Sequence, residues 1–166
     1  MSSLKLSLSA ILLILTLFLS IPAIILAQPP ESFNLPSQNT LPGSSGYPFK
    51  RLKEKITEFF KFSSTSKFSY RQSLLEKRVS ELVSLVENKN QQEIANASQR
   101  LAYEAGILAE STYNGSRSDK DLLIGLFEKY KPILSKMRDN FPANSPFWLL
   151  SQQDIDTLNI LSAKLK

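Results

Sequence analysis

The chain has 166 residues, a length that suits one folded domain with accessory segments. Its 20 basic and 15 acidic residues give a net charge of +5, and these charges are mixed rather than gathered in basic blocks as in many nucleic-acid binders. The sequence contains no cysteine and no histidine, which excludes disulfides, most nucleophilic triads and most transition-metal sites. Only five glycines are present, which favours long helices over a turn-rich β fold.

Residues 1–27 contain an uncharged run of 22 residues from Leu6 to Ala27, long enough to cross a bilayer as a helix. Lys5, the only charge before it, favours a cytoplasmic N-terminus and an exported remainder. The run fits a transmembrane anchor or a signal peptide cleaved after Ala27, although Ile25 is a poor match to a small-residue cleavage pattern. In either case we expect the rest of the chain outside the cytoplasm, membrane-anchored facing outward or secreted to the periplasm or beyond.

Residues 28–46 read QPPESFNLPSQNTLPGSSG, with four prolines and two glycines. A segment with this composition and so few apolar residues predicts a flexible linker that contributes nothing to a core. It would hold a folded domain just off the membrane if the preceding run is uncleaved.

A helix is predicted over 47–62, with Pro48 in its first turn, where the missing N–H costs little. Its apolar residues recur every three or four positions and form one stripe: Phe49, Leu52, Ile56, Phe59 and Phe60. This helix has two possible partners, the rest of a bundle or an anionic lipid surface. We expect the apolar stripe to pack in the bundle, because Glu54 and Glu58 dilute the basic charge that lipid would attract.

Two further amphipathic segments follow and are separated only by Asn88-Lys89-Asn90, so they are expected to pair as an antiparallel hairpin. Asn90 and Glu93 have the spacing of a capping box for the second helix. The expected inward positions are Phe68, Leu75, Val79, Leu82 and Val86 on the first helix, and Ile94, Ala97, Leu101, Ala105 and Leu108 on the second.

The stretches YPFKRLKE, LLEKRVSEL and RLAYEA, between Leu41 and Glu110, resemble an uncharacterised bacterial family named domain of unknown function 5667. The resemblance implies an exported or membrane-anchored helical domain without established chemistry. The turn before the first helix lacks the acidic residue expected of the family. Seven positions carry the match and are our candidate interface residues: Tyr47, Pro48, Lys50, Glu76, Arg78, Glu81 and Tyr103.

The last third predicts two more helices. Ser118 with Asp121, and Ser151 with Asp154, are candidate helix starts, and Pro132 is expected to kink or restart the first of them. The expected inward residues are Leu122, Leu123, Leu126, Phe127, Tyr130, Ile133, Leu134 and Met137, and then Ile155, Leu158, Leu161 and Leu165. Phe147 and Trp148 are typical either of a plug at the bundle end, which we favour, or of a ligand-stacking platform.

The sequence therefore predicts an all-α antiparallel bundle over 47–166, built around a long helical hairpin. Glu76, Glu81, Glu104 and Glu110 are spaced like ordinary helix-surface charges, so we expect no catalytic residues, no cofactor and no metal. The expected function is a non-catalytic protein-binding or regulatory module at the cell envelope. The alternative is an envelope ligand sensor or glycan-associated protein with an aromatic pocket. Expected partners are the membrane, through residues 6–27 if uncleaved, and another envelope protein, but not nucleic acid.

Overall fold

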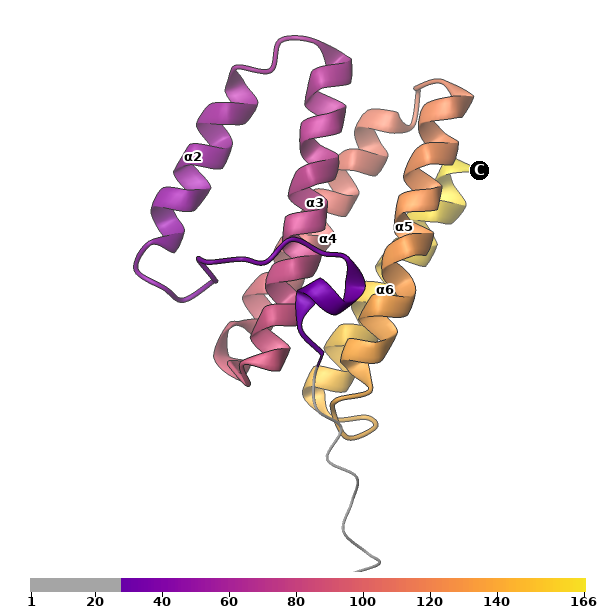
Figure 1. Cartoon of the computed structure of the whole chain (residues 1–166). Coiled ribbons are helices and arrows are strands. Elements are labelled where there is room, and N and C mark those ends of the chain that lie inside the picture. Colours follow the sequence, from indigo (N-terminus) through magenta and orange to yellow (C-terminus); the bar gives the residue numbers. More distant parts are fainter. Residues whose placement is uncertain (1–27) are drawn as a thin grey trace, which may run out of the picture.

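The computed structural model describes residues 28–166 and is built from α-helices and short 3-10 helices (Figure 1). This confirms the predicted all-α fold and the helix start at Tyr47. The elements in chain order are η1 (Pro30–Phe33), α2 (Tyr47–Phe59), α3 (Ser64–Glu87), η2 (Gln91–Glu93), α4 (Ile94–Thr112), α5 (Arg117–Arg138) and α6 (Pro146–Leu165).

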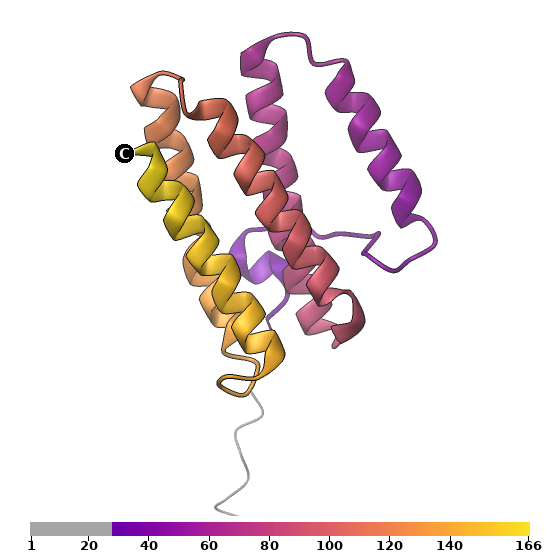
Figure 2. The ribbon, with the colours of Figure 1, turned by 180° about the vertical axis from the view of Figure 1, so that it is seen from behind.

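Helices α3 to α6 form an antiparallel bundle, and α2 stands beside α3 at its outer edge (Figures 1 and 2). Helix α3 packs mainly on α4, α4 packs also on α6, and α6 packs on α5. The connection between α3 and α4, residues 88–93 with η2 among them, is short, so α4 runs back antiparallel along α3. Lys89 in this turn has φ 55°, the left-handed conformation that reverses the chain direction.

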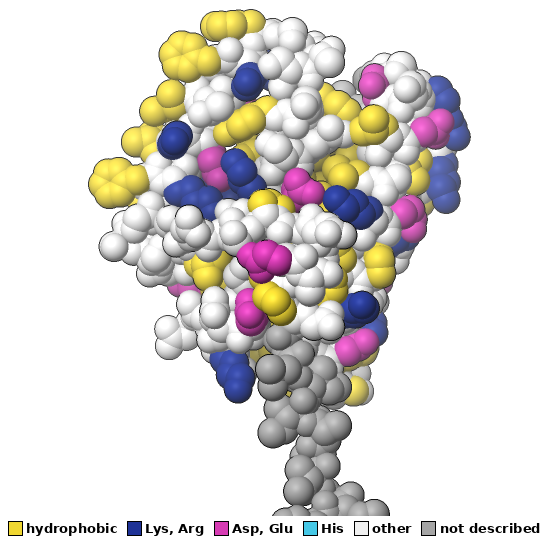
Figure 3. Space-filling view, in the orientation of Figure 1, with side chains coloured by type: hydrophobic (Ala, Val, Ile, Leu, Met, Phe, Trp, Pro, Cys, Tyr) yellow, Lys and Arg dark blue, Asp and Glu magenta, His cyan; other side chains and the backbone are white. Residues whose placement is uncertain are grey.

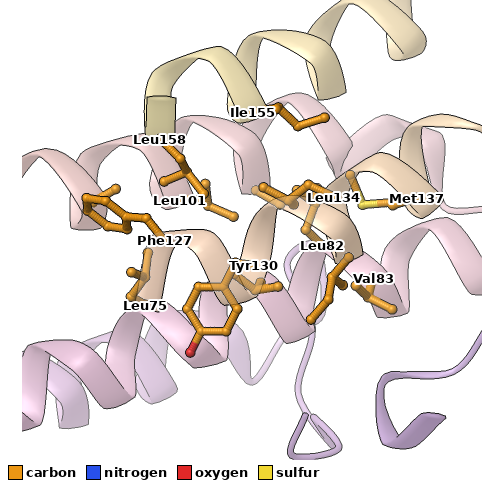
Figure 4. Packing of buried hydrophobic residues seen from close by; sticks show 14 of the residues in the cluster. Leu75, Leu82, Val83, Leu101, Phe127, Tyr130, Leu134, Met137, Ile155 and Leu158 are labelled. Atoms are coloured by element: carbon orange, nitrogen blue, oxygen red, sulfur yellow. The ribbon is translucent and has the colours of Figure 1, made fainter. Parts of the chain in front are cut away.

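The core lies between α3, α4, α5 and α6 and is formed mainly by the apolar positions that the sequence predicts (Figure 4). Leu122, which was predicted to point inward, is instead 53% exposed, because the buried face of α5 begins at the next residue, Leu123. Leu82 and Leu101 are both fully buried, and Phe127, Tyr130 and Leu158 meet them from the other two helices. The five predicted positions of α4 are all buried, and so are four of the five on α3, with Phe68 partly buried. The hairpin is thus held together by burial of the apolar side chains that recur with the 3.6-residue period of the helix.

Three helices begin after a serine whose hydroxyl accepts the backbone N–H three residues later: Ser63 for α3, Ser116 for α5 and Ser145 for α6. The predicted starts at Ser118 and Ser151 are wrong. Ser118 lies inside the first turn of α5, and Ser151 is buried in the second turn of α6. In each case an earlier serine satisfies the free N–H groups and extends the helix backward.

The structure contradicts one other local prediction and excludes one of the two alternatives given for Pro132. The Asn90 side chain makes no capping bond, and η2 takes the place of the predicted first turn before α4 begins at Ile94. Helix α5 continues through Pro132 as one element from Arg117 to Arg138 rather than restarting there.

The segment before α2 differs from the predicted linker, because it packs on the bundle. Pro30 and Leu35 are buried, and Leu35 joins the core cluster. The Ser80 hydroxyl on α3 donates a hydrogen bond to the carbonyl of Pro36. A few apolar residues at the right positions hold this segment on the bundle. The amino-acid composition of the segment does not reveal such contacts.

Within residues 28–166, no helix has the length and apolar character needed to span a bilayer. The run from Leu6 to Ala27, on which the anchor and signal-peptide predictions rest, lies outside the described residues.

Candidate functional site

Helix α2 is attached to the bundle by its charged side. We call the group of side chains at this contact the Arg78 cluster. Arg78 lies at its centre, fully buried on α3. The cluster comprises Tyr47, Lys50, Arg51 and Glu54 from α2, Arg78 and Glu81 from α3, and Glu104 from α4.

Glu81 accepts hydrogen bonds from three sides. The Tyr47 hydroxyl donates to Glu81 Oε2 at 3.0 Å, and Lys50 Nζ donates to Glu81 Oε1 at 2.7 Å. Arg78 Nη1 donates to both oxygens, at 2.8 and 3.0 Å. A carboxylate that is fully buried is tolerated only when its lone pairs are satisfied in this way.

The other side of Arg78 faces Glu54 and Glu104. Its Nη2 donates to Glu54 Oε2, which also accepts from Arg51 Nη1 at 3.1 Å. Glu104 Oε1 lies 3.9 Å from Arg78 Nε and 3.8 Å from Arg51 Nη1, close enough for charge attraction. Three basic side chains thus oppose three carboxylates, so the cluster is balanced in charge.

Burial and neighbouring charges alter the acidity of these groups. Burial, reinforced by Glu81, raises the pKa of Tyr47 to about 12, so its hydroxyl keeps its proton and acts as a donor. Burial opposes the charge on Arg78, but Glu81 and Glu54 outweigh it and raise its pKa. Burial raises the pKa of Glu104, although Arg78 and Arg51 favour its ionised form.

Polar contacts outside the cluster also hold α2. Arg71 on α3 forms an ion pair with Glu58, and the Tyr70 hydroxyl donates to the backbone carbonyl of Glu54 at 3.1 Å. The Arg100 guanidinium of α4 stacks over the Tyr47 ring at 4.8 Å. Charged and polar groups therefore anchor both ends of α2.

Four of the seven candidate interface residues meet in this cluster: Tyr47, Lys50, Arg78 and Glu81. Glu76 lies elsewhere on α3, with Lys129 Nζ of α5 at 3.2 Å. Pro48 occupies the first turn of α2 on the surface, and Tyr103 is exposed on α4.

Sequence reasoning missed Arg51, Glu54 and Glu104 as members of the cluster. It also treated Glu81 and Glu104 as ordinary surface charges, which is wrong, because both are buried among basic partners. The sequence does contain a pattern that indicates the inward position of Glu54. Tyr47, Arg51, Glu54 and Glu58 recur every three or four residues and form a polar stripe opposite the apolar one.

The apolar stripe of α2 points away from the bundle, so the prediction that it packs there is wrong. We call this stripe, together with Phe62 after the end of the helix, the α2 apolar face. Its members are 50% to 83% exposed and are visible along the outer edge of the molecule in Figure 3: Phe49, Leu52, Ile56, Phe59, Phe60 and Phe62. The physical reason is the Arg78 cluster, because the buried charges of α3 and α4 require charged partners that only the opposite side of α2 offers.

A second buried polar group lies between α4 and α6. The Ser98 hydroxyl donates to Asp154 Oδ1 at 2.6 Å, and Asp154 is only 2% exposed. Burial, opposed by this hydrogen bond, raises the pKa of Asp154 to about 7. Asp154 was predicted as part of a helix cap; instead it is a core carboxyl that titrates near neutrality.

The described surface also carries two open grooves. One, of about 530 Å³, lies between the ends of α3, α4 and α5, where Lys67, Arg71, Glu110 and Asp119 line it. Another, of about 350 Å³, lies between α4 and α6. Phe147 lines neither groove. Its ring packs on Phe141 at 5.4 Å and against the core, as expected of a plug at the bundle end.

Comparison with protein families finds a match to the family described as domain of unknown function (DUF5667), over residues 39–135. That range covers more than half of the chain. The chain belongs to this family. The matched range includes α2, α3 and α4, and with them every member of the Arg78 cluster. Comparisons with curated proteins and with solved structures gave no significant match.

Proposed function

We propose that this DUF5667-family chain is a non-catalytic binding module that acts at the cell envelope, and that the α2 apolar face is its contact surface. The observation that carries the proposal is this face, which leaves six large apolar side chains in solvent on one edge of an otherwise well-packed bundle. Contiguous exposed patches of this kind are typical of interaction sites.

The Arg78 cluster supports a structural role for the buried charges rather than a catalytic one. Its basic and acidic groups neutralise one another, and Arg78 and Glu81 are inaccessible to a substrate. A cluster of this kind holds α2 in a fixed orientation and so presents the apolar face on a rigid support.

The envelope location rests on the sequence. The uncharged run from Leu6 to Ala27 and Lys5 before it favour export of the remainder. Alkaline phosphatase fused after Lys166 should be active, because the enzyme matures only outside the cytoplasm. An inactive fusion, with a cytoplasmic reporter active at the same junction, would contradict this part of the proposal.

The contact surface is tested with photoreactive benzoylphenylalanine placed singly in the full chain in living cells. At position 59 we expect adducts to another macromolecule, whether lipid or protein. The matched control is position 160 on α6, because Ile160 is also an exposed apolar residue but lies away from α2. Equal yields at both positions, or none at 59, would overturn the assignment of the surface.

A further inference from the structure

The charges of α2 are divided between its two sides. Both acidic residues of the helix turn toward the bundle, where Glu54 pairs with Arg78 and Glu58 with Arg71. Lys53 and Lys55, in contrast, are exposed. The acidic residues that would weaken attraction to a negative surface are therefore neutralised by their inward partners.

Helical geometry places the two exposed lysines on opposite edges of the α2 apolar face. At 3.6 residues per turn, Lys53 lies next to Phe49 and Phe60 at one edge of the face, and Lys55 lies next to Phe59 at the other edge. Apolar side chains flanked by lysines form the pattern of a helix that lies in a lipid interface, with its rings among the acyl chains and its ammonium groups at the phosphates.

The aromatic surface continues past the end of α2. Phe59 and Phe60 meet edge to face with ring centroids 5.6 Å apart, and Phe60 meets Phe62 in the same way at 6.5 Å. Lys61 lies within this group, and exposed Lys67 follows in the first turn of α3. The tip between α2 and α3 therefore combines exposed phenylalanines with basic groups.

A second copy of the chain fits this surface less well. Symmetric dimers join the same patch of both partners, so they would bring the flanking lysines of one copy against the lysines of the other. A negatively charged surface gains from these same lysines. Charge complementarity therefore selects an anionic partner.

We propose that the α2 apolar face docks on an anionic lipid bilayer, with its phenylalanines inserted at the interface and Lys53 and Lys55 at the lipid phosphates. This inference rests on the proposed function and names the partner of the same surface. The uncharged run from Leu6 to Ala27, if it stays attached, would keep α2 within reach of such a bilayer.

The test uses the full chain reconstituted in vesicles of phosphatidylcholine alone, or mixed two to one with phosphatidylglycerol. The chain has no cysteine, so Phe59→Cys can carry a single environment-sensitive nitrobenzoxadiazole label. In the anionic vesicles we expect its emission to shift to the blue and to be quenched by doxyl-labelled lipids, and high salt to reverse both effects. The same label on Ile160→Cys should respond in neither vesicle.

The role of the lysines is tested in the labelled Phe59→Cys chain. Lys53→Gln with Lys55→Gln should lower the ratio of docked to undocked label about 25-fold, because each basic side chain near an anionic surface contributes a factor of about five. The matched control, Lys164→Gln with Lys166→Gln, removes the same charge from exposed positions at the end of the chain and should leave the ratio unchanged.

Three results would overturn the proposal. Absence of lipid quenching at position 59 in both vesicles would exclude docking. Equal quenching in neutral and anionic vesicles would exclude the role of lipid charge. A blue shift that grows with protein concentration, without lipid quenching, would identify a second copy as the occupant. If lipid docking fails while photocrosslinks from position 59 still reach a protein, the binding module stands and only its partner changes.

Discussion

The bundle of α3 to α6 and helix α2 use amphipathic sequences in opposite ways. In the bundle, residues such as Leu82, Leu101 and Phe127 turn inward, and the hydrophobic effect holds the helices together. In α2, Glu54 is buried while Phe59 is 75% exposed. Periodicity therefore identifies the two sides of a helix but not the side that faces the protein.

The partner surface decides the orientation of α2. Arg78, Glu81 and Glu104 lie on the faces of α3 and α4 that receive α2, and leaving them buried without counter-charges would cost several kcal/mol each. The polar side of α2 supplies these counter-charges: Glu54 for Arg78, Lys50 for Glu81 and Arg51 for Glu104. The apolar side is thereby left to solvent or to a binding partner.

The largest expected effect comes from removing the centre of the cluster. Arg78→Leu leaves the surrounding carboxylates buried without their main counter-charge and should destabilise the fold by about 3–5 kcal/mol in a urea melt of residues 28–166. Arg117→Leu is the control, because Arg117 forms an exposed pair with Asp121 and should change stability by at most about 1 kcal/mol. If Arg78→Leu lowers the free energy of unfolding no more than Arg117→Leu does, the cluster does not hold α2.

The stability of the bundle core is sensitive instead to cavities left by large-to-small substitutions. Leu82→Ala and Leu101→Ala should each cost about 2–5 kcal/mol, because both side chains are fully buried on facing helices. Leu149→Ala provides the comparison, since Leu149 is an exposed leucine on α6 and its loss should stay within about 0.5 kcal/mol. Urea melts measure all three, and unaltered melts for Leu82→Ala and Leu101→Ala would refute the assigned hairpin faces.

Asp154, which lies outside the Arg78 cluster, makes the stability of the bundle depend on pH. The pKa of Asp154 is about 7 in the folded chain, against an ordinary value of 3.8. As the pH rises, the unfolded chain therefore loses this proton at a lower pH than the folded chain does. The contribution of Asp154 to stability is therefore fully present below about pH 3.8 and is lost as the pH rises toward 7. Between about pH 5 and about pH 6.5, the free energy of unfolding should drop by roughly 2 kcal/mol.

Asp154→Asn should abolish that drop, because the side chain no longer ionises. Melts across the same pH range compare it with the unaltered chain. A slope that survives in Asp154→Asn would have to come from another group, such as Glu104, whose pKa is also raised by burial.

The smallest expected effect lies on the α2 apolar face. Phe59→Ser removes a ring that makes few contacts with the bundle, so the free energy of unfolding should change by no more than about 0.5 kcal/mol. The same melts measure it. A loss as large as that of a core phenylalanine, about 3–5 kcal/mol, would place this ring inside the fold.

Sequence patterns predicted the bundle well and the attachment of α2 poorly. The inward positions of α4 follow from spacing alone, since Ile94, Leu101 and Leu108 form a continuous stripe that must be covered. Whether Arg78 is buried depends on Glu54 and Glu81 reaching it, from 24 residues upstream and three residues downstream. One sequence shows that such charges exist, but only the fold shows that they converge.

The packed segment before α2 was missed for a related reason. Its proline-rich composition predicts a linker, yet Leu35 finds a place in the core and the carbonyl of Pro36 accepts from Ser80. The few apolar side chains that hold this segment do not recur with a regular period, so no sequence pattern predicts their burial. Tyr47 and Pro48, in contrast, mark the start of α2 by local chemistry, and the helix begins there.

Thiol accessibility tests the inverted orientation of α2 most directly. In residues 28–166, which contain no native cysteine, Ile56→Cys and Phe59→Cys should react with iodoacetamide nearly as fast as in the urea-unfolded chain. Leu82→Cys and Leu101→Cys should stay protected under the same conditions. Protection of positions 56 and 59 as strong as that of positions 82 and 101 would contradict the account, because it would mean that the apolar side of α2 faces the bundle.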